Sequence, residues 1–183
     1  MLKIIAIIVA LIVVGILIAA SMQPDNFSVT RSTTINAPAG KIYPLIVDFH
    51  GWSAWSPWEK VDPEMKRKYS GPEAGKGAVY EWEGNGQVGS GRMEITDAVA
   101  PGRVLIDLHF MKPMEGRNVA EFNLEPMGDT TKVTWTMRGP SRFITKVMGV
   151  FVSMDRMVGG MFETGLATLK SVSETAPVAA KPA

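Results

Sequence analysis

Alternation of apolar and polar residues dominates most of this chain. An alternating run covers 27–35, and six further strand-like segments follow at 65–69, 78–82, 93–95, 104–110, 120–124 and 133–137. A period of two is typical of a strand with one buried face. Residues that favour turns separate the segments, so we expect neighbouring strands to pair antiparallel. At one of these turns, Asn85-Gly86 predicts a two-residue hairpin of type I′.

The last part of the chain has a different period. Between 141 and 173 the apolar residues recur every three or four positions, which predicts one long amphipathic helix. A helical segment at 38–49 and a helical turn after it lie between the first two strands. Because a one-faced sheet must be covered, these helices are expected to pack on it. The sequence predicts an α+β helix-grip fold, a curved seven-stranded antiparallel sheet around a long C-terminal helix, with two short helices after the first strand. So strong a curvature encloses more space than one helix fills, which predicts a cavity.

The N-terminal segment is apolar throughout. Residues 4–20 are seventeen apolar residues without a charge, about 25 Å of helix, which is the short end of a bilayer span. An uncleaved membrane anchor and a signal sequence cut near Ala19, Ala20 and Ser21 are both open, and the length favours the anchor. Lys3 precedes the run, which favours a cytoplasmic N-terminus with the domain on the other side of the membrane. We expect four parts, namely a transmembrane anchor or signal segment at 1–22, a linker at 23–26, a folded domain at 27–174 and a disordered tail at 175–183.

Charge and composition exclude several classes of function. Nineteen Lys and Arg residues stand against eighteen Asp and Glu residues, and there is no cysteine. No net field therefore favours nucleic acid, and thiolate chemistry is excluded. His50 and His109 lie far apart without carboxylates at ligand spacing, so no metal site is predicted. We expect no cofactor, and the pattern indicates no oligomeric state.

Three of the five tryptophans recur at every third position, as Trp52, Trp55 and Trp58. Such a cluster either lines a concave site or plugs the narrow end of the core, and the sequence leaves both interpretations open.

Several motifs resemble a known superfamily. They are Ile35-Asn-Ala-Pro-Ala, Trp52-Ser-Ala-Trp-Ser-Pro-Trp-Glu, Tyr69-Ser-Gly-Pro-Glu-Ala-Gly-Lys-Gly-Ala, Val133-Thr-Trp-Thr-Met and the segment that begins with Met154-Asp-Arg-Met-Val-Gly-Gly. Together they resemble the START-like, Bet v 1-like (SRPBCC) superfamily, and in particular bacterial polyketide cyclase/dehydrase-type proteins, many of which begin with one hydrophobic anchor. The resemblance spans about 27–170 and implies the helix-grip fold. It leaves the function open, since the superfamily includes lipid carriers, plant hormone and allergen proteins, aromatases, hydratases and co-chaperone-like members.

The inward-facing apolar residues are the candidates for ligand binding. They are Trp52, Trp55, Trp58, Tyr80, Trp82, Met93, Phe110, Phe122, Trp135, Met137, Phe151 and Met154. Charged residues that alternate with them, such as Asp107 and Glu121, are expected on the outer face. This favours a membrane-tethered module that holds a lipid or another hydrophobic small molecule. The alternatives are a cyclase or dehydratase enzyme in which Tyr80 or Glu59 moves a proton, and a chaperone-like domain with an exposed apolar patch.

Overall fold

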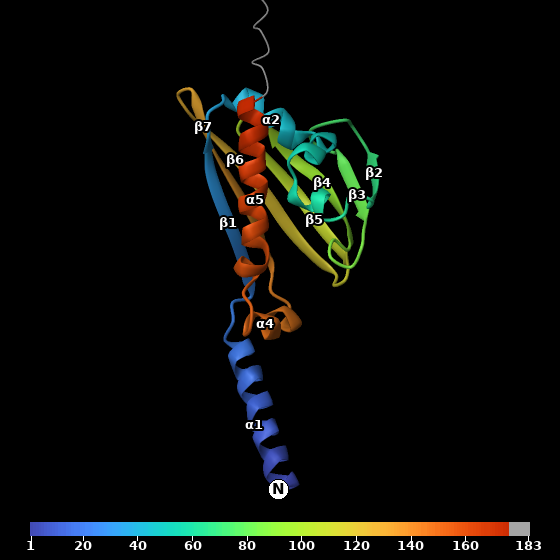
Figure 1. The fold of residues 1–183 in the computed structure, drawn as a ribbon, viewed down its shortest axis with the longest axis vertical. Helices are drawn as coiled ribbons and strands as arrows, with labels where there is room; N and C mark the ends of the chain where they lie inside the picture. Colours follow the sequence, from blue (N-terminus) through green and yellow to red (C-terminus); the bar gives the residue numbers. More distant parts are fainter. Residues whose placement is uncertain (176–183) are drawn as a thin grey trace, which may run out of the picture.

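A computed structural model describes residues 1–175, in which one helix extends away from a domain made of a curved sheet and packed helices (Figure 1). The helical elements are α1 (Leu2–Ser21), α2 (Ala39–Val47), the 3₁₀ helix η1 (Phe49–Ala54), α3 (Pro57–Val61), α4 (Phe143–Gly149) and α5 (Met154–Thr175). The strands are β1 (Asn26–Ile35), β2 (Lys66–Ser70), β3 (Val79–Glu83), β4 (Ser90–Val99), β5 (Arg103–Lys112), β6 (Gly116–Met127) and β7 (Thr130–Pro140). Apart from Thr175, the tail predicted at 175–183 lies outside the described residues.

The seven strands form one antiparallel sheet in the order β1-β7-β6-β5-β4-β3-β2. The sheet curves around α5, and α2, η1 and α3 lie on the same side of it (Figure 1). Alternation sets the faces as expected: on β5, Val104, Ile106 and Leu108 are buried, whereas Asp107 and His109 are not. The predicted α+β helix-grip fold is confirmed.

The long helix predicted at 141–173 is wrong in one respect, because the structure has two helices there. The chain leaves helical geometry between Gly149 and Met154, and the Ser153 hydroxyl accepts a hydrogen bond from the Arg156 N–H at 3.3 Å. On α5, Phe162, Leu166 and Leu169 are buried, but α4 has no buried residue. The apolar stripe runs on through the break, so periodicity alone did not reveal that its first part lies outside the core.

The two-residue turn predicted at Asn85-Gly86 is also wrong. Strands β3 and β4 are joined by residues 84–89, and the left-handed residue is Gly89 at φ 68°. The Asn85 side chain accepts a hydrogen bond from the Gln87 N–H at 2.8 Å, and Asp62 accepts one from the Asn85 N–H at 2.7 Å. Asn85 therefore organises a longer loop that folds back and buries Val88.

Helix α1 is long and apolar enough to cross a membrane, judged by its length and composition. Ala20 is its one buried residue, and the helix projects from the end of the domain where α4 lies (Figure 1).

Candidate ligand-binding cavity

The tryptophan segment begins as a 3₁₀ helix, in which side chains three residues apart lie above one another. Phe49, Trp52 and Trp55 follow that spacing, and their rings are in contact, with the centroids of Trp52 and Trp55 4.9 Å apart. The indole N–H of Trp52 donates to the Ile46 carbonyl at 2.9 Å, and that of Trp55 to the Leu45 carbonyl at 2.8 Å. Carbonyls in the last turn of a helix lack intrahelical partners, so the two indoles cap α2 and are held in place by it.

A cavity of about 550 Å³ lies between the sheet and α5, within the size range of small-molecule sites. Trp52 and Trp58 are on its wall, whereas Trp55 is not. Trp55 is fully buried behind them, with its ring centroid 5.6 Å from that of Trp135 and 5.9 Å from that of Phe122. The three tryptophans therefore differ in position: Trp55 packs in the core, and Trp52 and Trp58 face the cavity.

The structure brings nine of the twelve candidate residues to the cavity wall, namely Trp52, Trp58, Tyr80, Trp82, Met93, Phe110, Trp135, Met137 and Met154. It does not bring Trp55, Phe122 or Phe151 there. Phe122 is fully buried and stacks on Trp135 at 4.8 Å, so it supports the wall from behind. Phe151 is 66% exposed because it lies in the break between α4 and α5. The assignment of these three to the cavity is corrected on this ground.

Close backbone approach shapes one side of the wall. The Trp82 ring lies directly over Gly91 on the neighbouring strand, where any side chain would collide with the indole. The Trp82 N–H donates to the Val88 carbonyl at 3.3 Å. Gly91 therefore allows this large side chain to lie flat against the sheet.

One buried carboxylate interrupts the apolar lining. Glu59 on α3 has a side chain only 7% exposed, and it lines the cavity together with Tyr80. The Tyr80 hydroxyl donates to Glu59 Oε1 at 2.7 Å, and Arg67 Nε donates to Glu59 Oε2 at 2.8 Å. Arg67 also donates to the carbonyls of Met65 at 2.6 Å and Pro63 at 3.1 Å. The charge of Glu59 is thus paired and hydrogen-bonded, as a buried carboxylate requires.

Burial and the neighbouring Glu59 raise the pKa of Tyr80 far above that of an exposed tyrosine. Burial alone would lower the pKa of Arg67, but the hydrogen bond to Glu59, together with the charges of Glu59, Tyr80 and Tyr69, raises it overall. Tyr80 therefore stays protonated and Arg67 stays charged at neutral pH. The group can accept a further hydrogen bond at the carboxylate, but it holds its own protons firmly.

The alternation of the strands revealed Tyr80 but not this network. The sequence suggested Glu59 as a candidate proton carrier. It did not predict its partner Arg67, because nothing in the local pattern of β2 indicates a contact with α3. Three basic residues at the wall were also missed, Lys112, Arg117 and Arg142. Lys112 and Arg117 lie at the ends of β5 and β6 and Arg142 follows β7, where alternation no longer predicts the direction of a side chain.

The structure places this chain in the class of helix-grip proteins, in which a curved antiparallel sheet packs around one long helix and encloses an apolar cavity. The model of the family described as polyketide cyclase / dehydrase and lipid transport matches residues 26–174. The chain belongs to that family.

Solved structures share this fold at low sequence identity. Protein CV1439 from Chromobacterium violaceum is 14% identical with a TM-score of 0.58, and the match covers 84% of this chain and 100% of that one. A protein from Thermobifida fusca is 20% identical with a TM-score of 0.60, covering 80% and 92%. The Aha1 dimer from Colwellia psychrerythraea is 18% identical with a TM-score of 0.55, covering 81% and 97%. A comparison with functionally curated proteins found no match. At these identities the likeness concerns the fold alone.

Proposed function

We propose that this protein is a membrane-tethered module that holds a lipid or another hydrophobic small molecule in its cavity. The cavity itself carries the proposal: about 550 Å³ of space is kept open between sheet and helix, and most of its wall is apolar. Protein interiors otherwise pack without voids of this size, so an unfilled space costs stability unless a ligand occupies it. A family described by lipid transport is consistent with this role.

In this proposal α1 is the tether and residues 27–174 are the binding domain. The N-terminus lies in the cytoplasm and the domain on the opposite side of the membrane, because Lys3 precedes the apolar run. Glu59 and Tyr80 give the cavity one polar point, where a hydroxyl or amine of the ligand can donate to the carboxylate.

Native mass spectrometry of the full chain, released from detergent micelles, tests the proposal. We expect an apolar molecule to be retained from the membrane, or a fluorescent fatty acid to be accepted when none is retained. A chain that does neither would contradict the proposal.

A matched pair of variants ties binding to the cavity. Ala120 on β6 lines the cavity, and its neighbour Val119 faces the other side of the sheet. We expect Ala120→Leu to weaken binding of the fatty acid by at least about tenfold, because the added carbons occupy ligand space. Val119→Leu adds volume outside the cavity and should bind as the wild type does. Equal weakening by both variants would show that the fatty acid binds elsewhere.

A second candidate function is a cyclase or dehydratase reaction, and the 2.7 Å contact between Tyr80 and Glu59 in the cavity wall favours it. In that case Tyr80→Phe and Glu59→Gln abolish turnover of a polyketide-type substrate but leave its binding intact. Unchanged turnover in both variants would remove these residues from the mechanism.

A further inference from the structure

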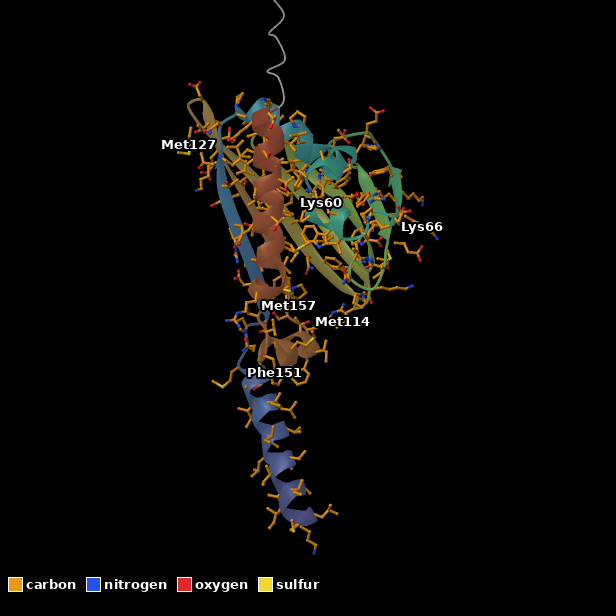
Figure 2. All side chains as sticks on the ribbon, viewed as in Figure 1. Lys60, Lys66, Met114, Met127, Phe151 and Met157 are labelled. Carbon is orange, nitrogen blue, oxygen red and sulfur yellow. The ribbon has the colours of Figure 1, made fainter. Side chains whose placement is uncertain are left out.

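Exposed apolar side chains gather at one end of the domain. They form what we term the membrane-proximal patch, consisting of Met114, Phe143, Ile144, Phe151, Val152 and Met157, each between 45% and 66% exposed. The patch includes α4, the break after it, the first turn of α5 and the turn between β5 and β6. Figure 2 shows Met114, Phe151 and Met157 together at the end of the domain that carries α1. So many apolar side chains at one place mark a surface that is covered by something apolar.

Short connections hold this patch beside α1. Helix α1 ends at Ser21 and β1 starts at Asn26, five steps along the chain, which span at most roughly 18 Å. The linker is also fixed to α4 and to the segment before it: the Ser141 N–H donates to the Asp25 carbonyl at 2.7 Å, and Lys146 Nζ on α4 pairs with the Asp25 carboxylate at 2.5 Å. Helices α1 and α4 are in contact as well. If α1 crosses a membrane, the patch therefore lies at the surface of that membrane.

The cavity opens at the same end. Its lining includes Met114, Ile144 and Met157, which belong to the patch, as well as Lys112, Arg117 and Arg142. Mostly apolar side chains thus line the cavity from the interior to the membrane-proximal patch. With the patch at a membrane surface, Lys112, Arg117 and Arg142 would lie near its phosphates, and the acidic Glu115 lies among them in the lining.

From these observations we propose that the membrane-proximal patch rests in the same membrane that α1 spans, and that the cavity takes its ligand directly from the bilayer through this opening. The inference rests on the proposed function and adds the source of the ligand, a membrane-resident lipid. Such a lipid would move from one apolar environment to another without crossing water, so its desolvation would not limit the exchange.

The chain contains no cysteine, which allows a single label to report the position of the patch. Phe151→Cys and Met127→Cys place an environment-sensitive fluorophore on two exposed positions at opposite ends of the domain (Figure 2). The full chain is reconstituted in vesicles of phosphatidylethanolamine and phosphatidylglycerol, with nitroxide groups on a fraction of the acyl chains. We expect quenching by the lipid nitroxides at position 151 and none at position 127. Equal exposure of both labels to water would overturn the proposal.

Contact with another protein surface gives a different result. If the label at position 151 is shielded only at high protein density and escapes the lipid nitroxides, the patch is an interface between copies of the chain, and the proposal is wrong.

The transfer step is tested with a phospholipid that carries a photoactivatable acyl chain, delivered to the bilayer by cyclodextrin. We expect cross-links to the cavity residues Met93 and Leu108. Phe143→Ser combined with Phe151→Ser should slow the appearance of these cross-links by at least about tenfold and leave their final level unchanged, because neither residue lines the cavity. Val99→Ser combined with Met127→Ser, which are also exposed but lie at the far end, should have no effect. An unchanged rate in the first variant would overturn direct transfer.

Failure of the proposed function is distinguishable from failure of this inference. If the lipid never reaches Met93, even from detergent micelles, the cavity does not bind lipid, whereas the labels at 151 and 127 still decide whether the patch lies in the membrane. If the lipid enters from micelles but position 151 is in water, the cavity binds lipid and the membrane-proximal patch does not serve it.

Discussion

At the scale of single residues, hydrogen bonds of a few polar atoms fix the side chains of the apolar cavity wall. Two indole N–H groups cap α2, and one carboxylate orients Tyr80. Each of these contacts satisfies a buried polar group, and each therefore selects one side-chain orientation. The cavity is bounded by residues that have little freedom to move into it.

Tyr80 gives a test that depends on pH. Burial and the hydrogen bond to Glu59 raise its pKa, so above about pH 10 the unfolded chain releases a proton that folded Tyr80 keeps. The stability contributed by Tyr80 is complete below about pH 10 and is lost as the pH rises further. We expect the free energy of unfolding to fall more steeply above about pH 10 in the wild type than in Tyr80→Phe.

Urea unfolding at several pH values measures this difference. Tyr43 also has a raised pKa, but it titrates in both chains and cancels in the comparison. The Tyr69 ring contacts Tyr80, with the centroids 5.2 Å apart, so the comparison is repeated in a Tyr69→Phe background, which removes the titration of Tyr69. At neutral pH the variant should lose about 1 kcal/mol for the missing hydrogen bond. If the free energy of unfolding changes with pH in the same way in both chains, the pKa of Tyr80 is not raised by folding.

At the scale of elements, α5 is seated on the sheet by its glycines as well as by its apolar stripe. A Cβ at Gly165 would lie 3.0 Å from both the Pro57 ring and the Trp135 ring, whereas a Cβ at Gly160 would meet nothing within 4 Å. Arg31 on β1 holds the first half of the helix, donating from Nε to Glu163 at 2.6 Å and from its terminal nitrogens to Asp155 at 2.7 and 3.0 Å.

The two glycines predict opposite effects for the same substitution. Gly160→Ala should stabilise the chain by up to about 1 kcal/mol, because alanine is the better helix former and the position is open. Gly165→Ala should destabilise it by about 1–3 kcal/mol, since the added methyl group pushes α5 away from α3 and the cavity wall. Urea unfolding of the two variants beside the wild type provides the measurement. A stabilising Gly165→Ala would mean that α5 lies farther from the wall than the structure places it.

The elements also show where prediction from the sequence fails. Strands with regular alternation were located correctly, because burial of one face acts on each strand separately. The break between α4 and α5 was missed, since the apolar period continues through residues that face away from the core. The loop at 84–89 was mistaken for a short turn because its conformation depends on Asp62, which lies far from it in the sequence.

At the scale of the whole molecule, the domain does not depend on α1 for its core. The helix contributes one buried residue, Ala20, and the pairing of β1 with β7 begins at Asn26. We expect a chain without residues 1–22 to keep the circular dichroism and the urea midpoint of the full chain. It should leave the membrane fraction on alkaline carbonate extraction, whereas the full chain should stay. Loss of cooperative unfolding on this truncation would contradict the domain boundary at 27–174.

The sequence by itself determined the strands, the apolar N-terminal helix, the helix-grip class and nine of the residues on the cavity wall. These follow from patterns repeated within a few residues, since each strand or helix needs to bury one face. Only the tertiary structure decided that Trp55 lies behind the cavity, that Arg67 and Tyr80 meet on Glu59, and that α4 leaves the core to lie beside α1. Those contacts join segments that are distant in the sequence, and they depend on how the curved sheet, its helices and the linker fit together in space.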